Sequence, residues 1–187
     1  AMIEDYKNFL KEILIDRSEL QARIAELGEE ISRDYKGKEL LMVCILRGGV
    51  FFTVDLMKNV DIPHKVEFMA ISSYGAGARE STGDVRITFD LQINIRGKHV
   101  LLVEDIIDSG HTLASVIEKL SVQAPASLEI CALLDKASRR EVDVPIKYRG
   151  FDIEDKFVFG YGLDIDDYFR GLPFIGVVDL DKYEPAE

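Results

Sequence analysis

The sequence has few cysteines, no long apolar run and a shortage of positive charge. Cys44 and Cys131, the two cysteines, lie in apolar stretches, so we interpret them as buried reduced thiols and expect a cytoplasmic protein. The longest apolar run, residues 40–46, is far shorter than the roughly 18 residues that a membrane-spanning helix needs. The first residues, with Glu4 and Asp5, lack the basic flank and apolar stretch of a signal peptide. We therefore expect no association with a membrane.

Lysine and arginine together number 23 against 34 aspartates and glutamates, which gives a net charge of -11. This balance argues against a protein whose main task is to bind nucleic acid, because such binding depends on neutralising phosphates. The 187 residues, 47% hydrophobic and 30% charged, have a typical globular composition and fit a single domain, residues 1–187.

Several common site motifs are missing. Residues 75–80 begin like a dinucleotide-binding G-x-G-x-x-G but end in glutamate and follow no turn between a strand and a helix, and the sequence contains no P-loop. No G-x-S-x-G elbow presents a serine nucleophile, and the three histidines lack the spacing of zinc ligands. These absences argue against dinucleotide binding and against P-loop, serine esterase and zinc hydrolase chemistry.

The apolar pattern predicts alternating strands and helices. A helix should begin after Asp16, because Asp16 and Glu19 have the spacing of a capping box and Leu20, Ile24 and Leu27 recur at helical intervals. Strands 40–46 and 65–71 flank a short helix at 50–59, and strands 99–103 and 127–134 flank a second at 110–122. Two such β-α-β units predict an α/β fold with a mainly parallel sheet flanked by helices.

Two other segments stand apart from this pattern. Residues 72–84 contain three glycines and little apolar periodicity, so we interpret them as a long loop of the kind that often serves as a lid. A further strand candidate follows this loop at residues 85–89. From Pro145 the chain is rich in glycine, aspartate and aromatics, and this tail contains short strand candidates at 157–159 and 174–178. We expect this tail to form a small appended lobe.

The stretch 100–113 carries the strongest chemical pattern. A buried strand runs into Glu104 and Asp105, and Asp108 then precedes Ser-Gly-His-Thr at the start of a helix. Ligands of open α/β sheets gather at the carboxyl ends of strands, and a helix N-terminus presents free N–H groups to an anion. Paired carboxylates suit ribose hydroxyls or hydrated Mg²⁺. Simple helix capping would explain each residue alone, but it does not explain the set.

Residues 103–112 resemble the phosphoribosyl-diphosphate binding signature of the type I phosphoribosyltransferases, in the form of the hypoxanthine/guanine branch. The resemblance extends over nearly the whole chain. It implies the type I phosphoribosyltransferase fold, a Rossmann-like core at about 16–149 and a small hood lobe from about 1–15 and 150–187.

The same resemblance implies roles for this stretch. Glu104 and Asp105 would contact the ribose hydroxyls, and Asp108 would act as the catalytic group at purine N7. The 5′-phosphate would lie on Ser109, Gly110, His111 and Thr112. His111 stands where some members have lysine, a change of little weight if the position acts through its backbone.

A diphosphate loop is implied at residues 46–49. Leu46, Arg47 and Gly48 resemble the family's loop, with a cis peptide bond expected between Leu46 and Arg47, and Arg170 would also reach the diphosphate. Without the resemblance, Gly48 and Gly49 would be equally compatible with an ordinary turn between a strand and a helix.

The remaining implied roles concern the lid, the base and the metal. Ser73 and Tyr74 would open the mobile lid. The purine would be bound by Lys136 at its 6-oxo group, by stacking on Phe157, and at its edge by Val158 and Asp164. Mg²⁺ would be held by Asp164, Glu104 and Asp105. By itself, a lysine after a strand is usually solvated and clustered aromatics are usually core.

The implied reaction transfers a 5-phosphoribosyl group from phosphoribosyl diphosphate to N9 of a 6-oxopurine, with Mg²⁺ as cofactor, in a homodimer or homotetramer. Lys136 and Phe157 favour a 6-oxopurine over adenine, which has a donor rather than an acceptor at position 6, but xanthine stays open beside hypoxanthine and guanine. An RNA-binding regulator on the same fold is a further alternative, against which the acidic charge argues.

Overall fold

The computed structural model of the chain describes residues 5–73 and 85–185, and the predicted lid residue Tyr74 lies outside them. In chain order, the described elements are η1 (Tyr6–Asn8), β1 (Leu10–Ile15), α1 (Arg17–Asp34), β2 (Leu40–Leu46), α2 (Val50–Lys58), β3 (His64–Ser73), β4 (Val85–Phe89), β5 (His99–Ile107), α3 (His111–Ser121), β6 (Ser127–Asp135), η2 (Ala137–Arg139), β7 (Tyr148–Asp152), β8 (Val158–Phe159) and β9 (Ile175–Val178).

The larger sheet has the strand order β4-β3-β2-β5-β6-β7. Its strands run parallel except β4, which pairs antiparallel with β3 at one edge. Leu40 is paired with His64 on one side and His99 on the other, so β2 and β5 lie side by side in the middle. The predicted α/β fold with a mainly parallel sheet is confirmed.

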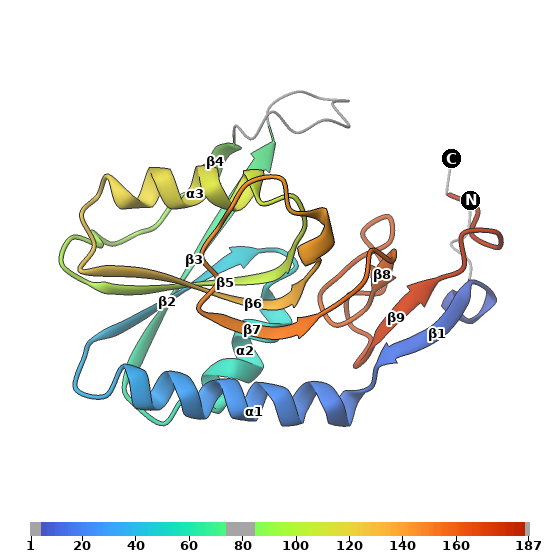
Figure 1. The fold of residues 1–187 in the computed structure, drawn as a ribbon, viewed down its shortest axis with the longest axis horizontal. Coiled ribbons are helices and arrows are strands. Elements are labelled where there is room, and N and C mark those ends of the chain that lie inside the picture. The colour runs from blue at the N-terminus through green and yellow to red at the C-terminus, as the bar shows by residue number, and fades with distance from the viewer. Residues whose placement is uncertain (1–4, 74–84, 186–187) are drawn as a thin grey trace.

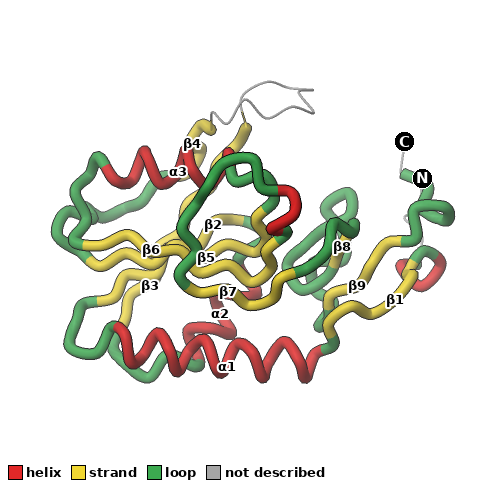
Figure 2. Tube along the Cα trace, viewed as in Figure 1, coloured by secondary structure: helices red, strands yellow, loops and turns green. Residues whose placement is uncertain are grey.

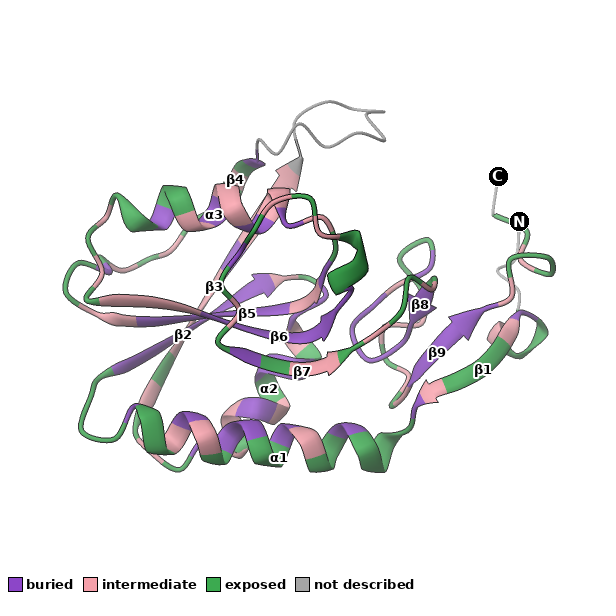
Figure 3. Ribbon diagram, in the orientation of Figure 1, coloured by how far each residue is buried: buried purple, intermediate pink, exposed green. Residues whose placement is uncertain are grey.

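The helices cover both faces of this sheet (Figure 1). On one face, α1 and α2 pack over Leu40 and Met42 of β2. On the other, α3 packs over the alternate residues Leu41 and Val43. Because successive side chains of a strand point to opposite faces, a strand covered on both sides must be apolar throughout, as residues 40–46 are. Figure 3 shows β2, β5 and β6 buried at the centre of the molecule.

A capping box starts α1, as the sequence predicts. The Glu19 N–H donates to Oδ1 of Asp16 at 2.8 Å, and the Asp16 N–H donates to Oε1 of Glu19 at 3.4 Å. The apolar stripe of the helix, with Leu20, Ile24 and Leu27, is fully buried against the sheet.

A second, antiparallel sheet has the order β1-β9-β8 and is visible apart from the larger one in Figure 2. It draws on segments far apart in the sequence, since Leu10 of β1 is paired with Val178 of β9. Phe9 and Phe159 pack with Ile165 and Val178 in a separate apolar cluster. This sheet places the loop 160–172 beside the carboxyl ends of the central strands.

The sequence pattern did not predict three features. Neither β1 nor β7 was expected, because their residues are partly exposed and lack an apolar run. The strand β5 continues to Ile107, so Glu104 and Asp105 lie within the strand rather than after it. As for membrane crossing, no described helix combines the required length with an apolar character.

Candidate active site

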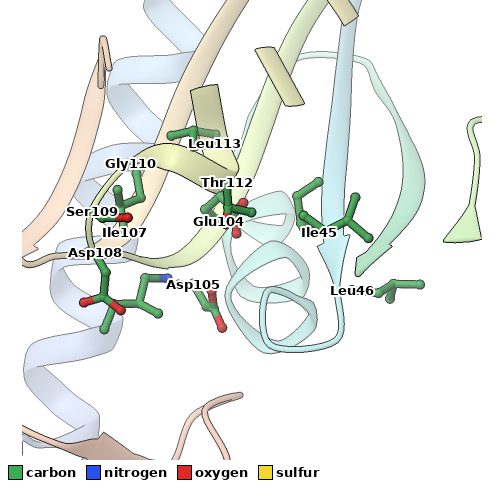
Figure 4. Close-up of a pocket in the computed structure, with 12 residues that line it drawn as sticks. Ile45, Leu46, Glu104, Asp105, Ile107, Asp108, Ser109, Gly110, Thr112 and Leu113 are labelled. Atoms are coloured by element: carbon green, nitrogen blue, oxygen red, sulfur yellow. Dashed lines mark hydrogen bonds between the residues drawn. The ribbon is translucent and has the colours of Figure 1, made fainter. Parts of the chain in front are cut away.

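The carboxyl ends of β2 and β5 border a cavity of about 280 Å³. Figure 4 shows its lining, in which Asp105 and Asp108 project toward the same side of the loop that follows β5. Across the cavity lie residues of β2 and β3. The lining residues are Ile45, Leu46, Ile71, Glu104, Asp105, Ile106, Ile107, Asp108, Ser109, Gly110, Thr112 and Leu113.

Residues 108–112 form the loop that leads into the N-terminus of α3, which we call the anion loop for its predicted role. Gly110 is the N-cap residue of α3, with φ of 91°. Among the described residues, no side chain forms a capping hydrogen bond at this end of the helix. A Cβ atom at Gly110 would lie 2.7 Å from the carbonyl oxygen of Val142, so only glycine fits. Free N–H groups and the helix dipole make such an N-terminus suitable for a phosphate.

The side chain of His111 contacts a residue outside the anion loop. Its Nε2 atom lies 2.8 Å from Oε2 of Glu141, on the segment that follows η2. The backbone of His111 stays at the start of α3, with its N–H donating to the Ser109 hydroxyl at 3.4 Å.

Two neighbouring acids at the end of β5 are held in a dehydrated setting. Burial raises the pKa of Glu104 well above its usual value, and the charge of Asp105 raises it further. Burial also raises the pKa of Asp105 to about 6, although the Ile106 N–H, which donates to it at 2.7 Å, acts in the opposite direction. Such a pair favours a ligand that brings hydroxyl donors or a cation.

The loop after β2 lies against this acidic pair. The peptide bond between Leu46 and Arg47 is cis, as expected from the family resemblance. A Cβ atom at Gly48 would lie 1.8 Å from Oδ2 of Asp105. On its other side, a Cβ atom at Gly162 would lie 2.2 Å from the Gly48 carbonyl oxygen. Glycines at both positions therefore let Asp105, the loop and the 160–172 segment come into contact.

Two predicted diphosphate ligands, Arg47 and Arg170, lie around one carboxylate. NH1 of Arg47 is 3.2 Å from Oδ2 of Asp167, and NH2 of Arg170 is 3.1 Å from Oδ1 of the same residue. Arg170 also donates to the Gly162 carbonyl at 2.7 Å and lies 3.5 Å from Asp164. The structure thus brings the loop after β2 and the C-terminal segment to one place.

Lys136 follows β6 and lies next to Asp108. Its Nζ atom is 3.7 Å from Oδ1 of Asp108 and 3.4 Å from Oδ1 of Asp155, and its side chain is only 11% exposed. Asp155 in turn pairs with Arg139 at 3.1 Å, which holds the pKa of Asp155 below its usual value. A group that can move a proton and a cation that can bind an oxo group are therefore neighbours.

The remaining predicted positions are those proposed for the base and the lid. Phe157 exposes 43% of its surface, whereas Val158 at the start of β8 is buried. Ser73 is the last residue of β3.

A preformed metal centre is not evident: in residues 5–73 and 85–185, no three His, Cys, Asp or Glu side chains gather as a metal site. The predicted ligands nevertheless suit Mg²⁺, which usually takes one or two carboxylates and completes its shell with water and substrate phosphates. Asp164 is close enough to Asp105 for its charge to raise the pKa of that residue. These donors fit a metal that arrives with a diphosphate.

Three further residues near the site, Asp135, Arg140 and Arg149, are not marked by any motif in the sequence. Asp135 is the last residue of β6 and is fully buried, with both arginines paired to its carboxylate. Its only signal in the sequence is an acid at the end of an apolar strand, directly before Lys136.

Comparison with known proteins places these features in a family. Residues 13–166 match the sequence model of a family described as "Phosphoribosyl transferase domain". Hypoxanthine phosphoribosyltransferase of Salmonella typhimurium is 53% identical over 174 residues, which are 91% of this chain and 97% of that protein. Hypoxanthine-guanine phosphoribosyltransferase of Mycobacterium tuberculosis is 44% identical over 187 residues, covering 97% of this chain and 92% of that protein.

A solved structure with a similar fold carries the same kind of name as the relatives found by sequence. The crystal structure of a hypoxanthine phosphoribosyltransferase from Staphylococcus aureus superimposes with a TM-score of 0.92 at 43% identity, and the match covers 98% of this chain and 100% of that one. With the family match spanning most of the chain and the relatives covering nearly all of it, the chain belongs to the phosphoribosyl transferase domain family.

Proposed function

We propose that the protein is a pentosyltransferase of purine salvage, which transfers the 5-phosphoribosyl group of phosphoribosyl diphosphate to N9 of hypoxanthine and guanine. The products are IMP or GMP and diphosphate. The observation that carries this proposal is one cavity edge that joins the anion loop, the acidic pair and the neighbours Asp108 and Lys136. The names of both relatives support hypoxanthine as a substrate, and the name of the Mycobacterium tuberculosis relative also supports guanine.

The phosphate groups of the substrate have two complementary sites in this proposal. Backbone N–H groups and hydroxyls of Ser109, Gly110, His111 and Thr112 bind the 5′-phosphate. Arg47, Arg170 and the backbone of residues 46–48 bind the diphosphate. Fixed donors of this kind stabilise the negative charge that the leaving diphosphate gains as its bond to C1′ breaks.

Glu104 and Asp105 bind the ribose hydroxyls, and they would hold Mg²⁺ together with Asp164. When bound, Mg²⁺ supplies positive charge at the diphosphate oxygens. The dehydrated setting of the two acids supports this role, because a ligand that brings a cation or hydroxyl donors relieves their mutual repulsion.

The base lies between Lys136 and the exposed ring of Phe157. Lys136 donates to the 6-oxo group, Asp108 exchanges the proton at N7, and Val158 with Asp164 faces the base edge. The position of Lys136, 3.7 Å from Asp108, supports a purine that contacts both through its adjacent oxo group and N7. Ser73 leads into the proposed lid.

The setting and assembly of the enzyme complete the proposal. Both thiols are free and buried, which suits the reducing cytoplasm. Phe51 and Val54, exposed on α2, offer apolar surface for a homodimer or homotetramer.

A substrate panel tests the proposed function. With Mg²⁺ and phosphoribosyl diphosphate present, we expect turnover of hypoxanthine and guanine, and none of adenine or uracil. Xanthine turnover would widen the base range without changing the reaction. Absence of turnover with every 6-oxopurine would refute the proposal.

A further inference from the structure

We propose that Arg140 is a positioning residue that, anchored by the buried carboxylate of Asp135, holds the anion loop in the shape that receives a phosphate. The inference rests on the proposed role of residues 108–112 as the 5′-phosphate site. Arg140 does not line the cavity, so its contribution acts through the loop backbone.

Asp135 provides a fixed anchor at the end of β6. Its side chain is fully buried, and both of its oxygens are in use: Oδ1 pairs with NH2 of Arg140, and Oδ2 accepts from Nε of Arg149 at 2.6 Å. A buried carboxylate needs such partners, because an unpaired charge in the interior is strongly unfavourable. The ion pair with buried Asp135 therefore fixes the position of the Arg140 guanidinium.

The other end of that guanidinium reaches the anion loop. NH1 of Arg140 donates to the backbone carbonyl of Asp108 at 2.7 Å. A planar guanidinium can hold two acceptors at a set separation and angle, which a lysine ammonium cannot do with the same rigidity. Arg140 thus links a rigid strand to the first residue of the loop.

The residues next to Arg140 support the following peptide of the loop. The N–H groups of Glu141 and Val142 both donate to the Ser109 carbonyl, at 2.9 and 3.1 Å. The space beside Gly110 is filled by the Val142 carbonyl and by Cδ of Arg140, 2.7 and 3.1 Å from where a Cβ atom would be. Segment 140–142 therefore contacts three successive residues of the loop from outside the cavity.

This arrangement matters for binding because the loop carbonyls are turned outward. With the carbonyls of Asp108 and Ser109 occupied by donors from segment 140–142, the chain after them turns into α3 and leaves its first N–H groups for an anion. Loss of the Arg140 contact frees the Asp108 carbonyl and lets the loop take other conformations. A disordered loop must then be ordered by the ligand, which weakens binding.

Arg149 provides a matched control. It pairs with the same buried carboxylate through β7, but no contact joins it to the loop. Arg140→Met and Arg149→Met each remove one of the two partners of Asp135. Both variants should lower the unfolding temperature, whereas only the first removes the link to Asp108.

The experiment measures the affinity of ribose 5-phosphate by calorimetry, together with the KM values of phosphoribosyl diphosphate and hypoxanthine. We expect Arg140→Met to weaken ribose 5-phosphate binding about tenfold, the scale of one lost well-placed hydrogen bond. The KM of phosphoribosyl diphosphate should rise with it, and the KM of hypoxanthine should stay within about twofold. Arg149→Met should leave ribose 5-phosphate affinity within about twofold of the parent protein.

Arg140→Lys covers the case in which Arg140→Met does not fold. The ammonium keeps a charge beside Asp135 and so restores stability, but it cannot hold both acceptors in the same geometry, and the loss of affinity should persist. Equal weakening by the Arg140 and Arg149 substitutions, or unchanged affinity in both Arg140 variants, would overturn the inference.

The readouts also separate this inference from the proposed function. If the parent protein binds ribose 5-phosphate but transfers no phosphoribosyl group to any 6-oxopurine, the proposed function fails and the comparison of arginine variants still stands. If the parent protein turns over hypoxanthine while the Arg140 variants bind ribose 5-phosphate normally, only the positioning role fails.

Discussion

Arg47 forms an ion pair with Asp167, a residue 120 positions later in the chain, and the two side chains join the loop after β2 to the C-terminal segment. Asp167 also pairs with Arg170. The carboxylate therefore occupies both cations proposed to bind diphosphate. An incoming diphosphate has to compete with Asp167 for them.

Replacing Asp167 with asparagine should strengthen the binding of diphosphate. Arg47 loses its carboxylate partner and Arg170 keeps only Asp164, and because the pairs with Asp167 are largely exposed, the expected gain is only about twofold to fourfold. Asn tolerates the positive φ of 70° at this position, so the turn should persist. Calorimetric titration with diphosphate measures the effect, which should diminish as salt is added.

Asp166→Asn is the control for this substitution, since it removes the same charge one residue earlier. Asp166 accepts a hydrogen bond from the Tyr183 hydroxyl instead of pairing with an arginine. If the two variants bind diphosphate with equal affinity, general electrostatics rather than the release of Arg47 and Arg170 is responsible.

Asp108→Asn should lower kcat by about 10² to 10⁴ while changing the KM of phosphoribosyl diphosphate little. An amide cannot exchange the proton at N7, whereas the backbone of the anion loop is unaffected. Steady-state kinetics with hypoxanthine measures both quantities. Asp155→Asn, on the other side of Lys136, is the comparison and should lower kcat far less. An unchanged kcat in Asp108→Asn would remove this residue from the chemistry.

Gly48→Ala should lower kcat/KM for phosphoribosyl diphosphate by about 10²-fold. The added methyl would lie 1.8 Å from Oδ2 of Asp105, so either the loop or the acid must move, and a small displacement in a site is costly. Gly171→Ala is the control, because nothing lies within 4 Å of its added Cβ. Equal activity of the two variants would show that the loop tolerates displacement from Asp105.

Two tyrosines next to each other in the fold should respond oppositely to loss of their hydroxyls. The Tyr148 hydroxyl donates to Oδ2 of Asp34 at 2.6 Å, whereas the buried Tyr35 hydroxyl has no hydrogen-bond partner in residues 5–73 and 85–185. Tyr148→Phe should lower the free energy of unfolding by about 1 to 2 kcal/mol, and Tyr35→Phe should leave it unchanged or raise it. Urea denaturation compares them, and equal losses would contradict this account.

The capping box of α1 should make part of the stability depend on pH. Hydrogen bonds from the Glu19 backbone and from Ser18 hold the pKa of Asp16 below its usual 3.8. A carboxyl with a lowered pKa stabilises the fold above its unfolded pKa, and the stabilisation is lost as pH falls through the folded value. Asp16→Ala should therefore be less stable than the parent at pH 7, with a gap that narrows below pH of about 4. Urea denaturation at several pH values would reveal a constant gap if this is wrong.

The sequence predicts the central fold because its signals are local. The apolar run 40–46 and the capping pair Asp16 and Glu19 each specify their element within a few residues. By contrast, β1 is half exposed and is stabilised by pairing with β9, more than 150 residues away, as the partners Leu10 and Val178 show. Such pairing leaves no periodic trace in either segment.

The candidate site likewise has a part that the sequence predicts and a part that it does not. The stretch from Glu104 to Thr112 is contiguous, so its pattern is readable and the cavity lining includes most of it. The contact between Gly162 and Gly48 and the ion pairs of Asp135 depend on how separate elements pack. The spacing of residues along the chain does not predict these contacts, because they depend on the packing of segments that are distant in the sequence.

Since Leu10 is paired with Val178, the second sheet cannot form during translation until Val178 has been synthesised. The parallel strands β2, β3, β5 and β6, by contrast, are complete once Asp135 has been synthesised. Once segment 140–142 has followed, the proposed phosphate end of the cavity can assemble, whereas the proposed base end still lacks β9, the partner of β8. A nascent chain that terminates before Ile175 would carry an anion loop without the sheet that supports selection of a base.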